Sequence, residues 1–168
     1  MTAQILTQAR LHELLHYDPE TGEFTWLVAS ARREKGSKAG CLVIKGYVDI
    51  GLDMKIYRAH RLAWLYVHGQ WPTQWIDHIN GVKNDNRIDN LREASKKQNA
   101  ENTTKQKRNT SGYKGVTWDN FTGNWKAQIC HNGKHHNLGR FTEVENAKNA
   151  YLAAANRLFT HIDRIKQE

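Results

Sequence analysis

The spacing of apolar residues changes several times along the chain, and each change marks a predicted helix or strand. Apolar side chains recur at helical spacing in residues 7–16, 60–68 and 142–158. Short alternating runs predict strands at residues 24–27, 42–50 and 55–59, separated by turn-forming residues. Thr7 is placed to cap the first helix and Gly69 to end the second. The pattern therefore predicts an α+β chain built from hairpins and short helices.

The middle of the chain has the order strand, turn-rich loop, strand, helix. These predicted segments are residues 75–79, 80–86, 87–92 and 96–103. The order places Asp77 and His78 on the first strand and Asn90 near the end of the loop. Asn99 then lies one turn into the helix, and we expect it to face back toward the hairpin. Asp77, His78, Asn90 and Asn99 are thus predicted to converge.

The last third of the chain predicts a three-stranded antiparallel sheet followed by a helix. Its strands are residues 113–118, 124–131 and 134–140, and Asn132-Gly133 is a strong hairpin signal. Thr142 and Glu145 have the spacing of a capping box for the helix. Because side chains alternate along a strand, the middle strand would pack Trp125, Ala127 and Ile129 on the helix, and expose Lys126, Gln128 and Cys130 on the open face.

The positive charge of the chain is concentrated in one block. The net charge is +8, but residues 1–91 hold eleven Lys or Arg against ten Asp or Glu, whereas residues 92–140 hold ten against three. A block of this kind suits a polyanion, and double-stranded DNA is the expected partner. A membrane partner is not expected, because the block lacks a sustained amphipathic helix and no apolar run reaches bilayer length. With no signal-peptide pattern at the N-terminus, we expect a cytoplasmic protein of a bacterial or phage-infected cell.

At residues 75–102 the sequence resembles the HNH endonucleases, in particular the phage and intron-encoded homing endonucleases with a ββα-metal core. Asp77-His78, Asn90-Leu91 and Asn99 carry the resemblance, which extends upstream into YRAHRLAW. Many members have His where this chain has Asn99, so it resembles an H-N-N variant. His60 and His68 stand at the ends of a predicted helix, where a cap or surface role is commoner, and we place both outside the site.

The resemblance implies a role for each residue of the motif. His78 would be the general base that takes a proton from the water attacking the scissile phosphate, and Asn90 would orient His78 through a hydrogen bond. Asp77 and Asn99 would hold one divalent cation, and their oxygen ligands favour Mg²⁺ or Mn²⁺. The alternative is that these Asp and Asn residues are only turn formers. The complete set, with basic residues around it, favours an active site.

Residues 111 to about 160 resemble the AP2/ERF DNA-binding domain, in which the open face of the sheet lies in the major groove. SGYKGVTW, NWKAQI, LGRF and the Ala-rich helix carry this resemblance. It is preceded by a basic linker whose lysines and arginine could follow a phosphate backbone. For Trp118, core packing is the alternative to DNA contact. The residues expected to contact DNA are Arg87, Lys96, Lys97, Lys105, Lys107, Arg108, Lys114, Thr117, Trp118, Lys126, Gln128, His135 and Asn137.

The sequence therefore predicts a monomeric, metal-dependent, site-directed DNA endonuclease without an obligate protein partner. It would hydrolyse a phosphodiester bond to 5′-phosphate and 3′-OH ends, nicking one strand per monomer. The alternative is a DNA-binding regulator that keeps an HNH-like scaffold without catalysis. The predicted divisions are an N-terminal helix and hairpin region at residues 1–57, the HNH core at 58–103, the basic linker at 104–112 and the AP2/ERF-like domain at 113–163.

Overall fold

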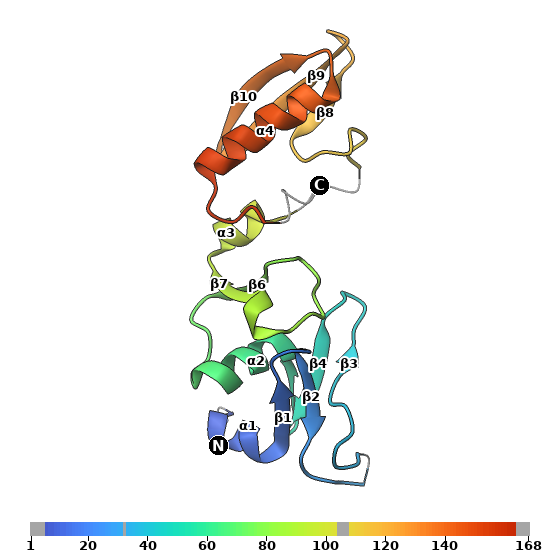
Figure 1. The fold of residues 1–168 in the computed structure, drawn as a ribbon, viewed down its shortest axis with the longest axis vertical. Coiled ribbons are helices and arrows are strands. Elements are labelled where there is room, and N and C mark those ends of the chain that lie inside the picture. Colours follow the sequence, from blue (N-terminus) through green and yellow to red (C-terminus); the bar gives the residue numbers. More distant parts are fainter. Residues whose placement is uncertain (1–5, 32, 104–107, 164–168) are drawn as a thin grey trace. The chain divides into compact units, whose positions relative to one another are not determined.

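A computed structural model describes residues 6–31, 33–103 and 108–163 of the chain. Its contacts divide the chain into two compact units, Met1–Ser95 and Lys96–Glu168, and most of their elements are labelled in Figure 1. The α+β character predicted from the sequence is confirmed, because both units combine short helices with small antiparallel sheets. Over the described ranges, none of the helices has the length and apolarity needed to cross a bilayer.

The first unit begins with a helix that passes directly into a hairpin. Helix α1 (Gln8–Leu14) is capped as predicted, since the Thr7 hydroxyl accepts a hydrogen bond from the Arg10 backbone N–H (3.2 Å). The predicted helical end at residues 15–16 is wrong, because the chain becomes extended at Leu15. There β1 (Leu15–Asp18) begins and pairs with β2 (Glu23–Trp26).

A three-stranded sheet and a second helix follow. The sheet contains β3 (Cys41–Leu42), β4 (Val48–Leu52) and β5 (Lys55–Arg58) in that order. The single strand predicted at 42–50 is interrupted by a turn, in which Gly46 has a φ of 80°. Helix α2 (Ala59–His68) follows β5 directly, and it ends as predicted at Gly69, whose φ of 75° is left-handed.

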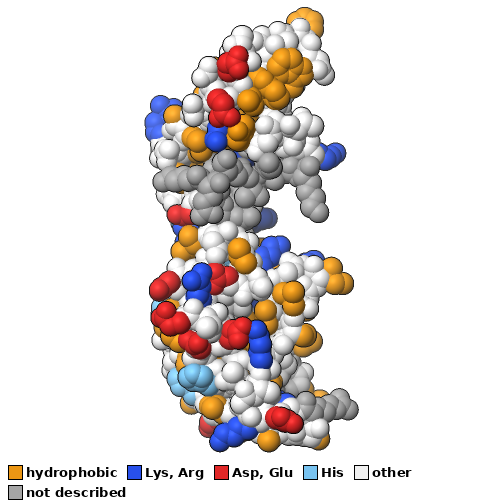
Figure 2. All heavy atoms as spheres, turned by 45° about the vertical axis from the view of Figure 1, so that its right-hand side comes forward, with side chains coloured by type: hydrophobic (Ala, Val, Ile, Leu, Met, Phe, Trp, Pro, Cys, Tyr) orange, Lys and Arg blue, Asp and Glu red, His pale blue; other side chains and the backbone are white. Residues whose placement is uncertain are grey.

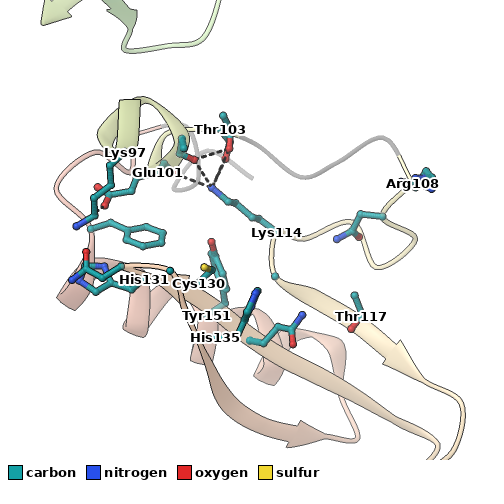
Figure 3. Close-up of a pocket in the computed structure, with 17 residues that line it drawn as sticks. Lys97, Glu101, Thr103, Arg108, Lys114, Thr117, Cys130, His131, His135 and Tyr151 are labelled. Atoms are coloured by element: carbon teal, nitrogen blue, oxygen red, sulfur yellow. Dashed lines mark hydrogen bonds and ion pairs between the residues drawn. The ribbon is translucent and has the colours of Figure 1, made fainter. Parts of the chain in front are cut away.

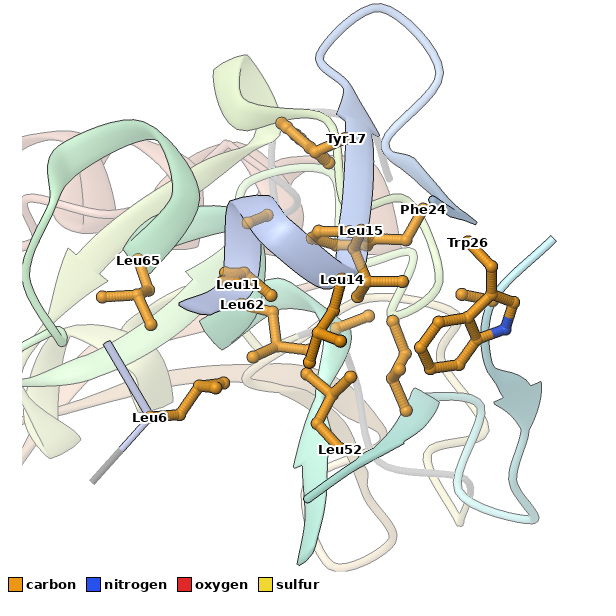
Figure 4. Close-up of a cluster of buried hydrophobic side chains, with 14 of the residues drawn as sticks. Leu6, Leu11, Leu14, Leu15, Tyr17, Phe24, Trp26, Leu52, Leu62 and Leu65 are labelled. Carbon is orange, nitrogen blue, oxygen red and sulfur yellow. The ribbon is translucent and has the colours of Figure 1, made fainter. Parts of the chain in front are cut away.

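One apolar core joins these elements. Leucines of α1 and α2 pack against aromatic residues of the first hairpin and against Leu52 of β4, as Figure 4 shows. Its fully buried members include Leu11, Leu15, Phe24, Leu52, Leu62 and Leu65. The N-terminal helix and hairpin are therefore part of the same hydrophobic core as α2.

The hairpin predicted for the nuclease motif is present as a separate two-stranded sheet. Strand β6 (Trp75–His78) pairs antiparallel with β7 (Leu91–Ala94), and a short 3-10 helix, η1 (Ile88–Asn90), ends the loop between them. The return strand starts at Leu91, later than the predicted residue 87. A longer segment therefore joins the strands, and of the four polar motif residues it holds Asn90, at the end of η1.

The second unit contains α3 (Lys96–Glu101), then β8 (Val116–Asp119), β9 (Asn124–His131), β10 (Lys134–Phe141) and α4 (Val144–Leu158). The sheet order is β10-β9-β8, and both residues of the Asn132-Gly133 turn have positive φ, as the hairpin signal predicts.

The predicted capping box at the start of α4 is wrong. The cap of α4 is Glu143, and the Glu145 carboxylate instead accepts a hydrogen bond from the Tyr113 hydroxyl (2.6 Å).

Helix α4 covers one face of this sheet. Val116, Ala127 and Ala147 are buried together, and Trp125 packs against them. Ile129 is buried with Tyr151, Ala154 and Ala155 of the helix. The predicted division of β9 into a helix-facing side and an open side is therefore confirmed.

Candidate active site and nucleic-acid interface

Asp77 is held in place by a partner directly across the hairpin. It lies on β6 opposite Arg92 of β7, and its side chain is buried, with 5% of the residue exposed. Its Oδ2 accepts hydrogen bonds from Nη2 (3.0 Å) and Nε (3.2 Å) of Arg92. A guanidinium therefore already partly neutralises the carboxylate predicted to bind a metal ion. The residue pattern did not predict this role for Arg92.

His78, the last residue of β6, is 5% exposed. Its Nε2 lies 3.4 Å from Oδ1 of Asn86, a long contact. Burial lowers the pKa of His78, opposed by Asn86 and by the carboxylates of Asp77 and Asp85. The neutral imidazole, which can accept a proton, is therefore favoured near neutral pH.

Asn90 orders the loop instead of contacting His78. Its Oδ1 accepts a hydrogen bond from the Asn80 backbone N–H (3.0 Å), and its Nδ2 donates to the backbone oxygen of Asp85 (2.8 Å). Its own backbone oxygen accepts from the Ile79 N–H (2.9 Å). The expected hydrogen bond from Asn90 to His78 is thus replaced by the contact from Asn86. Both polar atoms of the Asn90 side chain are already hydrogen-bonded to the backbone of the loop.

Asn86 is fixed by the N-terminal hairpin, a relationship that the sequence did not predict. The Tyr17 hydroxyl donates a buried hydrogen bond of 2.7 Å to the backbone oxygen of Asn86. Gly22, with a φ of 72°, lies so close to the backbone of Asn86 and Arg87 that a Cβ atom there would clash. The β1–β2 hairpin therefore buttresses the loop that faces His78.

Two more rings surround His78. The His60 ring centroid is 5.0 Å from that of His78, with the planes nearly perpendicular, and the Tyr47 centroid is 6.0 Å from it. His60 is 8% exposed, and its Nδ1 is buried without a hydrogen-bond partner. His60 was expected to lie outside the site because it stands at the start of a predicted helix. This expectation is wrong, because the ring of His60 packs against the ring of His78. His68, at the opposite end of α2, is exposed and packs on Trp64.

Arg87 is engaged by a neighbour within the loop. Its Nε and Nη2 donate to the two carboxylate oxygens of Asp85 at 2.8 and 2.6 Å, while its side chain stays half exposed. This pairing, chiefly the hydrogen bond from Arg87, lowers the pKa of Asp85 to about 2. A DNA contact by Arg87 stays a prediction. A DNA phosphate would have to compete with the Asp85 carboxylate for the Arg87 guanidinium, or bind to its remaining N–H groups.

Asn99 lies on α3, and α3 belongs to the second unit, whereas Asp77 and His78 belong to the first. Lys114 caps this helix: its Nζ donates to the backbone oxygens of Glu101 (2.9 Å) and Thr103 (2.7 Å), as Figure 3 shows. The buried carboxylate of Glu101 accepts a hydrogen bond from the Thr160 N–H (3.2 Å). Lys114, expected to contact DNA, is therefore engaged in fixing α3.

A cavity of about 750 Å³ opens beside α3 within the second unit (Figure 3). Its wall contains Lys97 and Arg108 together with three side chains of the open sheet face, Thr117, Gln128 and His135. Lys97 lies 3.7 Å from the Glu101 carboxylate, and Lys96 is exposed on the same helix. Lys105 and Lys107, also expected to contact DNA, lie outside the described residues.

The strand register decides which predicted DNA contacts share a face. Thr117 is opposite Lys126, and Gln128 is opposite Asn137, all on the open side. His135, opposite the exposed Cys130, lies on that side as well. The Asn137 amide oxygen accepts from the Gly139 N–H (3.1 Å) at a bulge. These open-face positions remain predictions as DNA contacts.

Trp118 does not belong to that group. It is opposite Trp125, on the side where Val116 and Ala127 pack against α4. Its ring meets that of Trp125 edge to face at 5.0 Å, and 43% of Trp118 is exposed. The expectation that it shares the open face with Thr117 is wrong, because adjacent residues of a strand point to opposite sides. Arg140, which the sequence analysis did not assign, occupies the open face opposite Lys126 and pairs with Asp119 (2.9 Å).

Charge is distributed differently in the two units. In the view of Figure 2, acidic and basic side chains are interspersed over the first unit. This agrees with the near balance of eleven basic and ten acidic residues in residues 1–91.

Within the described residues, no group of three or more His, Cys, Asp or Glu side chains is placed to hold a metal ion. A cation here would therefore need amide, phosphate or water oxygens besides the carboxylate of Asp77.

Comparisons with known proteins identify the segment that holds the motif. A family model described as HNH endonuclease matches residues 57–101, which include α2, β6, β7 and α3. Protein 3.8 of Escherichia phage T7 is 38% identical over 85 residues, which cover 50% of this chain and 70% of that protein. No solved structure matches the chain. The matched segment holds Asp77, His78, Asn90 and Asn99, so the chain carries an HNH endonuclease domain at residues 57–101 and belongs to the same family as protein 3.8.

Proposed function

We propose that the chain is a metal-dependent DNA endonuclease that nicks one strand per monomer and leaves 5′-phosphate and 3′-OH ends. The observation that carries this proposal is the buried pair Asp77 and His78 at the end of β6, with the pKa of His78 lowered. A neutral imidazole next to a hard oxygen ligand is what hydrolysis of a phosphodiester by an activated water requires. The homing subtype and the AP2/ERF-like character of residues 113–163 belong to the same proposal.

His78 acts as the general base. Its imidazole accepts the proton of the attacking water, and the negative charges of Asp77 and Asp85 favour the imidazolium that results. Asn86 contacts Nε2 and helps to set the orientation of the ring. Asn90 contributes by holding the loop closed, so that Asn86 stays in reach of His78. His78, Asp77, Asn86 and Asn90 each have a separate task, although all four are buried.

For one Mg²⁺ or Mn²⁺, Asp77 would supply a carboxylate oxygen and Asn99 would supply an amide oxygen. A carboxylate and an amide oxygen fit a hard divalent cation, which would complete its coordination with phosphate and water. When bound, such an ion stabilises the negative charge that develops on the phosphate and on the departing 3′ oxygen. Arg92 offsets the charge of Asp77 before any cation is present, so the carboxylate stays buried at a lower cost.

The second unit binds duplex DNA through the open face of its sheet. Lys126 and Gln128 project from that face, and Thr117 and His135 lie beside them. Gln can read adenine, and Lys can contact guanine or phosphate. Lys96, Lys97 and Arg108 add positive charge within the same unit. The lysines at 105 and 107 extend the basic segment in the sequence.

Plasmid cleavage tests the proposal. Supercoiled DNA is incubated with the full chain and Mg²⁺ or Mn²⁺, and conversion to the nicked circle is followed. His78→Ala should abolish nicking and preserve DNA binding, since His78 acts in chemistry alone. Nicking by His78→Ala at the wild-type rate would exclude His78 as the base.

The second candidate function is a DNA-binding regulator that retains the family fold as a scaffold. The Asp77–Arg92 ion pair favours it, because a carboxylate paired across a hairpin can serve stability alone. The same plasmid assay separates the two. Specific binding without nicking under either metal supports the regulator, whereas metal-dependent nicking that is lost in His78→Ala supports the endonuclease.

A further inference from the structure

His60 is a buried histidine with one ring nitrogen that has no hydrogen-bond partner. It is the second residue of α2, and its Nδ1 is buried without a hydrogen-bond partner. A buried polar atom left unpaired costs about 1–3 kcal/mol, so Nδ1 of His60 does not stabilise the fold, and the contacts that His60 makes here are those of its ring. The neighbours that are present are rings: Tyr47 at 5.4 Å and His78 at 5.0 Å between centroids.

The rings of His60, Tyr47 and His78 pack against one another. The His60 ring meets that of His78 at 78°, close to an edge-to-face arrangement, and the Tyr47 ring contacts both at tilted angles. Such pairs prefer this geometry over a parallel stack and restrict how the partner ring can turn. The Nε2 atom of His78 lies 3.4 Å from Oδ1 of Asn86, which is a long contact.

Helix α2 gives His60 a rigid base. The helix is fixed in the core of the first unit by Leu62, Ala63 and Leu65, all buried. The residue before the helix, Arg58, is held by an ion pair of 2.7 Å to Asp49. A side chain in the first turn of this helix therefore has little freedom, and it can transmit that rigidity to the ring that it touches.

We propose that His60 is a positioning residue for His78: its ring, fixed by α2 and backed by Tyr47, holds the imidazole of His78 in the orientation used for catalysis. This inference rests on the proposed role of His78 as the base. His60 acts by ring contact, so its nitrogen atoms are not required. A small misplacement of a catalytic group can cost about 100-fold in rate, which sets the scale of the effect.

Three substitutions separate the ring from the nitrogen atoms. His60→Ala removes both, His60→Asn retains a polar group near the position of Nδ1 without the ring, and His60→Phe retains a ring without nitrogen. His68→Ala, at the far end of the same helix, is the matched control and should cleave like the wild type. The readouts are the steady-state nicking rate at saturating DNA (kcat), the DNA concentration for half-maximal rate (KM), and thermal unfolding.

The proposal expects kcat to fall about 10- to 100-fold in His60→Ala and His60→Asn, with KM for DNA within about threefold of wild type. His60→Phe should lose less than about tenfold and should unfold at the same or a higher temperature, because it removes an unpaired polar atom. Full activity in His60→Asn with loss in His60→Phe would overturn the proposal in favour of a hydrogen-bonding role. Wild-type kcat in all three variants would overturn it as well.

A second measurement does not depend on cleavage. The ring protons of His78, assigned by comparison with His78→Ala, should shift and broaden in the NMR spectrum of His60→Ala and remain sharp in His60→Phe. Unchanged His78 signals in His60→Ala would contradict the positioning role even if no nuclease activity is found. Absence of nicking by the wild type with either metal would instead count against the proposed function, so the two failures are distinguishable.

Discussion

Asp77 and Arg92 face one another across β6 and β7, with Oδ2 of the carboxylate 3.0 Å from Nη2 of the guanidinium. In many active sites, removal of a functional carboxylate stabilises the fold, because residues kept for activity are often strained or poorly compensated. Here removal leaves a mostly buried guanidinium without this partner. We therefore expect Asp77→Ala to abolish metal-dependent nicking and also to destabilise the metal-free protein by about 1–3 kcal/mol.

The measurement is urea unfolding in the presence of a chelator. Asp89→Ala, which removes an exposed carboxylate of the neighbouring loop, serves as the control and should change stability by less than about 0.5 kcal/mol. Increased stability in Asp77→Ala would show that Arg92 does not compensate the buried carboxylate.

The N-terminal hairpin should influence cleavage through Tyr17. In Tyr17→Phe the backbone oxygen of Asn86 loses its buried donor, which should cost about 1–3 kcal/mol of stability. Nicking should slow as well, because Asn86 is the side chain that faces Nε2 of His78. Tyr66→Phe is a close control, since its ring lies 5.6 Å from that of Tyr17 in the same cluster. Equal nicking rates in the two variants would argue against the buttress.

These two relationships show where prediction from sequence succeeds and where it ends. Asp77 and His78 could be located because a strand, a turn-rich loop and a strand follow one another within a few residues. Tyr17 and Asn86 are 69 residues apart, and the hydrogen bond uses a backbone oxygen, which no residue pattern encodes. His60 was misassigned for the same reason. A histidine in the first turn of a helix reads as a cap until the tertiary fold places it against another ring.

In the second unit, the alternation of side chains correctly predicted which residues of β9 face α4. The same rule should have separated Thr117 from Trp118, but the family resemblance grouped them together. The strand register separates them, because Trp118 is opposite Trp125 and Thr117 is opposite Lys126. The role of Lys114 was hidden by its charge. A lysine in a basic block suggests a phosphate contact, whereas here its ammonium group binds backbone oxygens at the end of α3.

Acid should destabilise the first unit through its buried histidines. Burial, followed by the positive charges of His78, Arg61 and Arg58, lowers the pKa of His60 to about 3. Between that value and the unfolded pKa of about 6.5, the unfolded chain binds a proton that the folded chain does not, so stability falls as pH decreases. Each such group contributes up to about 1.4 kcal/mol per pH unit.

Urea unfolding of wild type and His60→Phe at pH 7 and pH 5 measures this contribution. The variant should lose less stability over the interval, because one of its two buried histidines no longer titrates. The carboxylate of Asp85, with a pKa of about 2, stays ionised throughout and does not interfere. Equal losses in the two proteins would mean that His60 is protonated in the folded state near pH 6.

Lys126 and Lys114 should differ in how they affect DNA binding. Lys126 projects from the open face of the sheet, and its replacement by Ala should weaken binding and reduce the slope of log K against log salt by about 1. Lys114→Ala should leave that slope unchanged, because the ammonium group is occupied by the carbonyl oxygens of Glu101 and Thr103. Its effect should be seen in α3, whose amides should exchange faster with deuterium. Fluorescence anisotropy over a salt series together with hydrogen exchange checks both results. A reduced salt slope in Lys114→Ala with unchanged exchange in α3 would restore Lys114 as a phosphate contact.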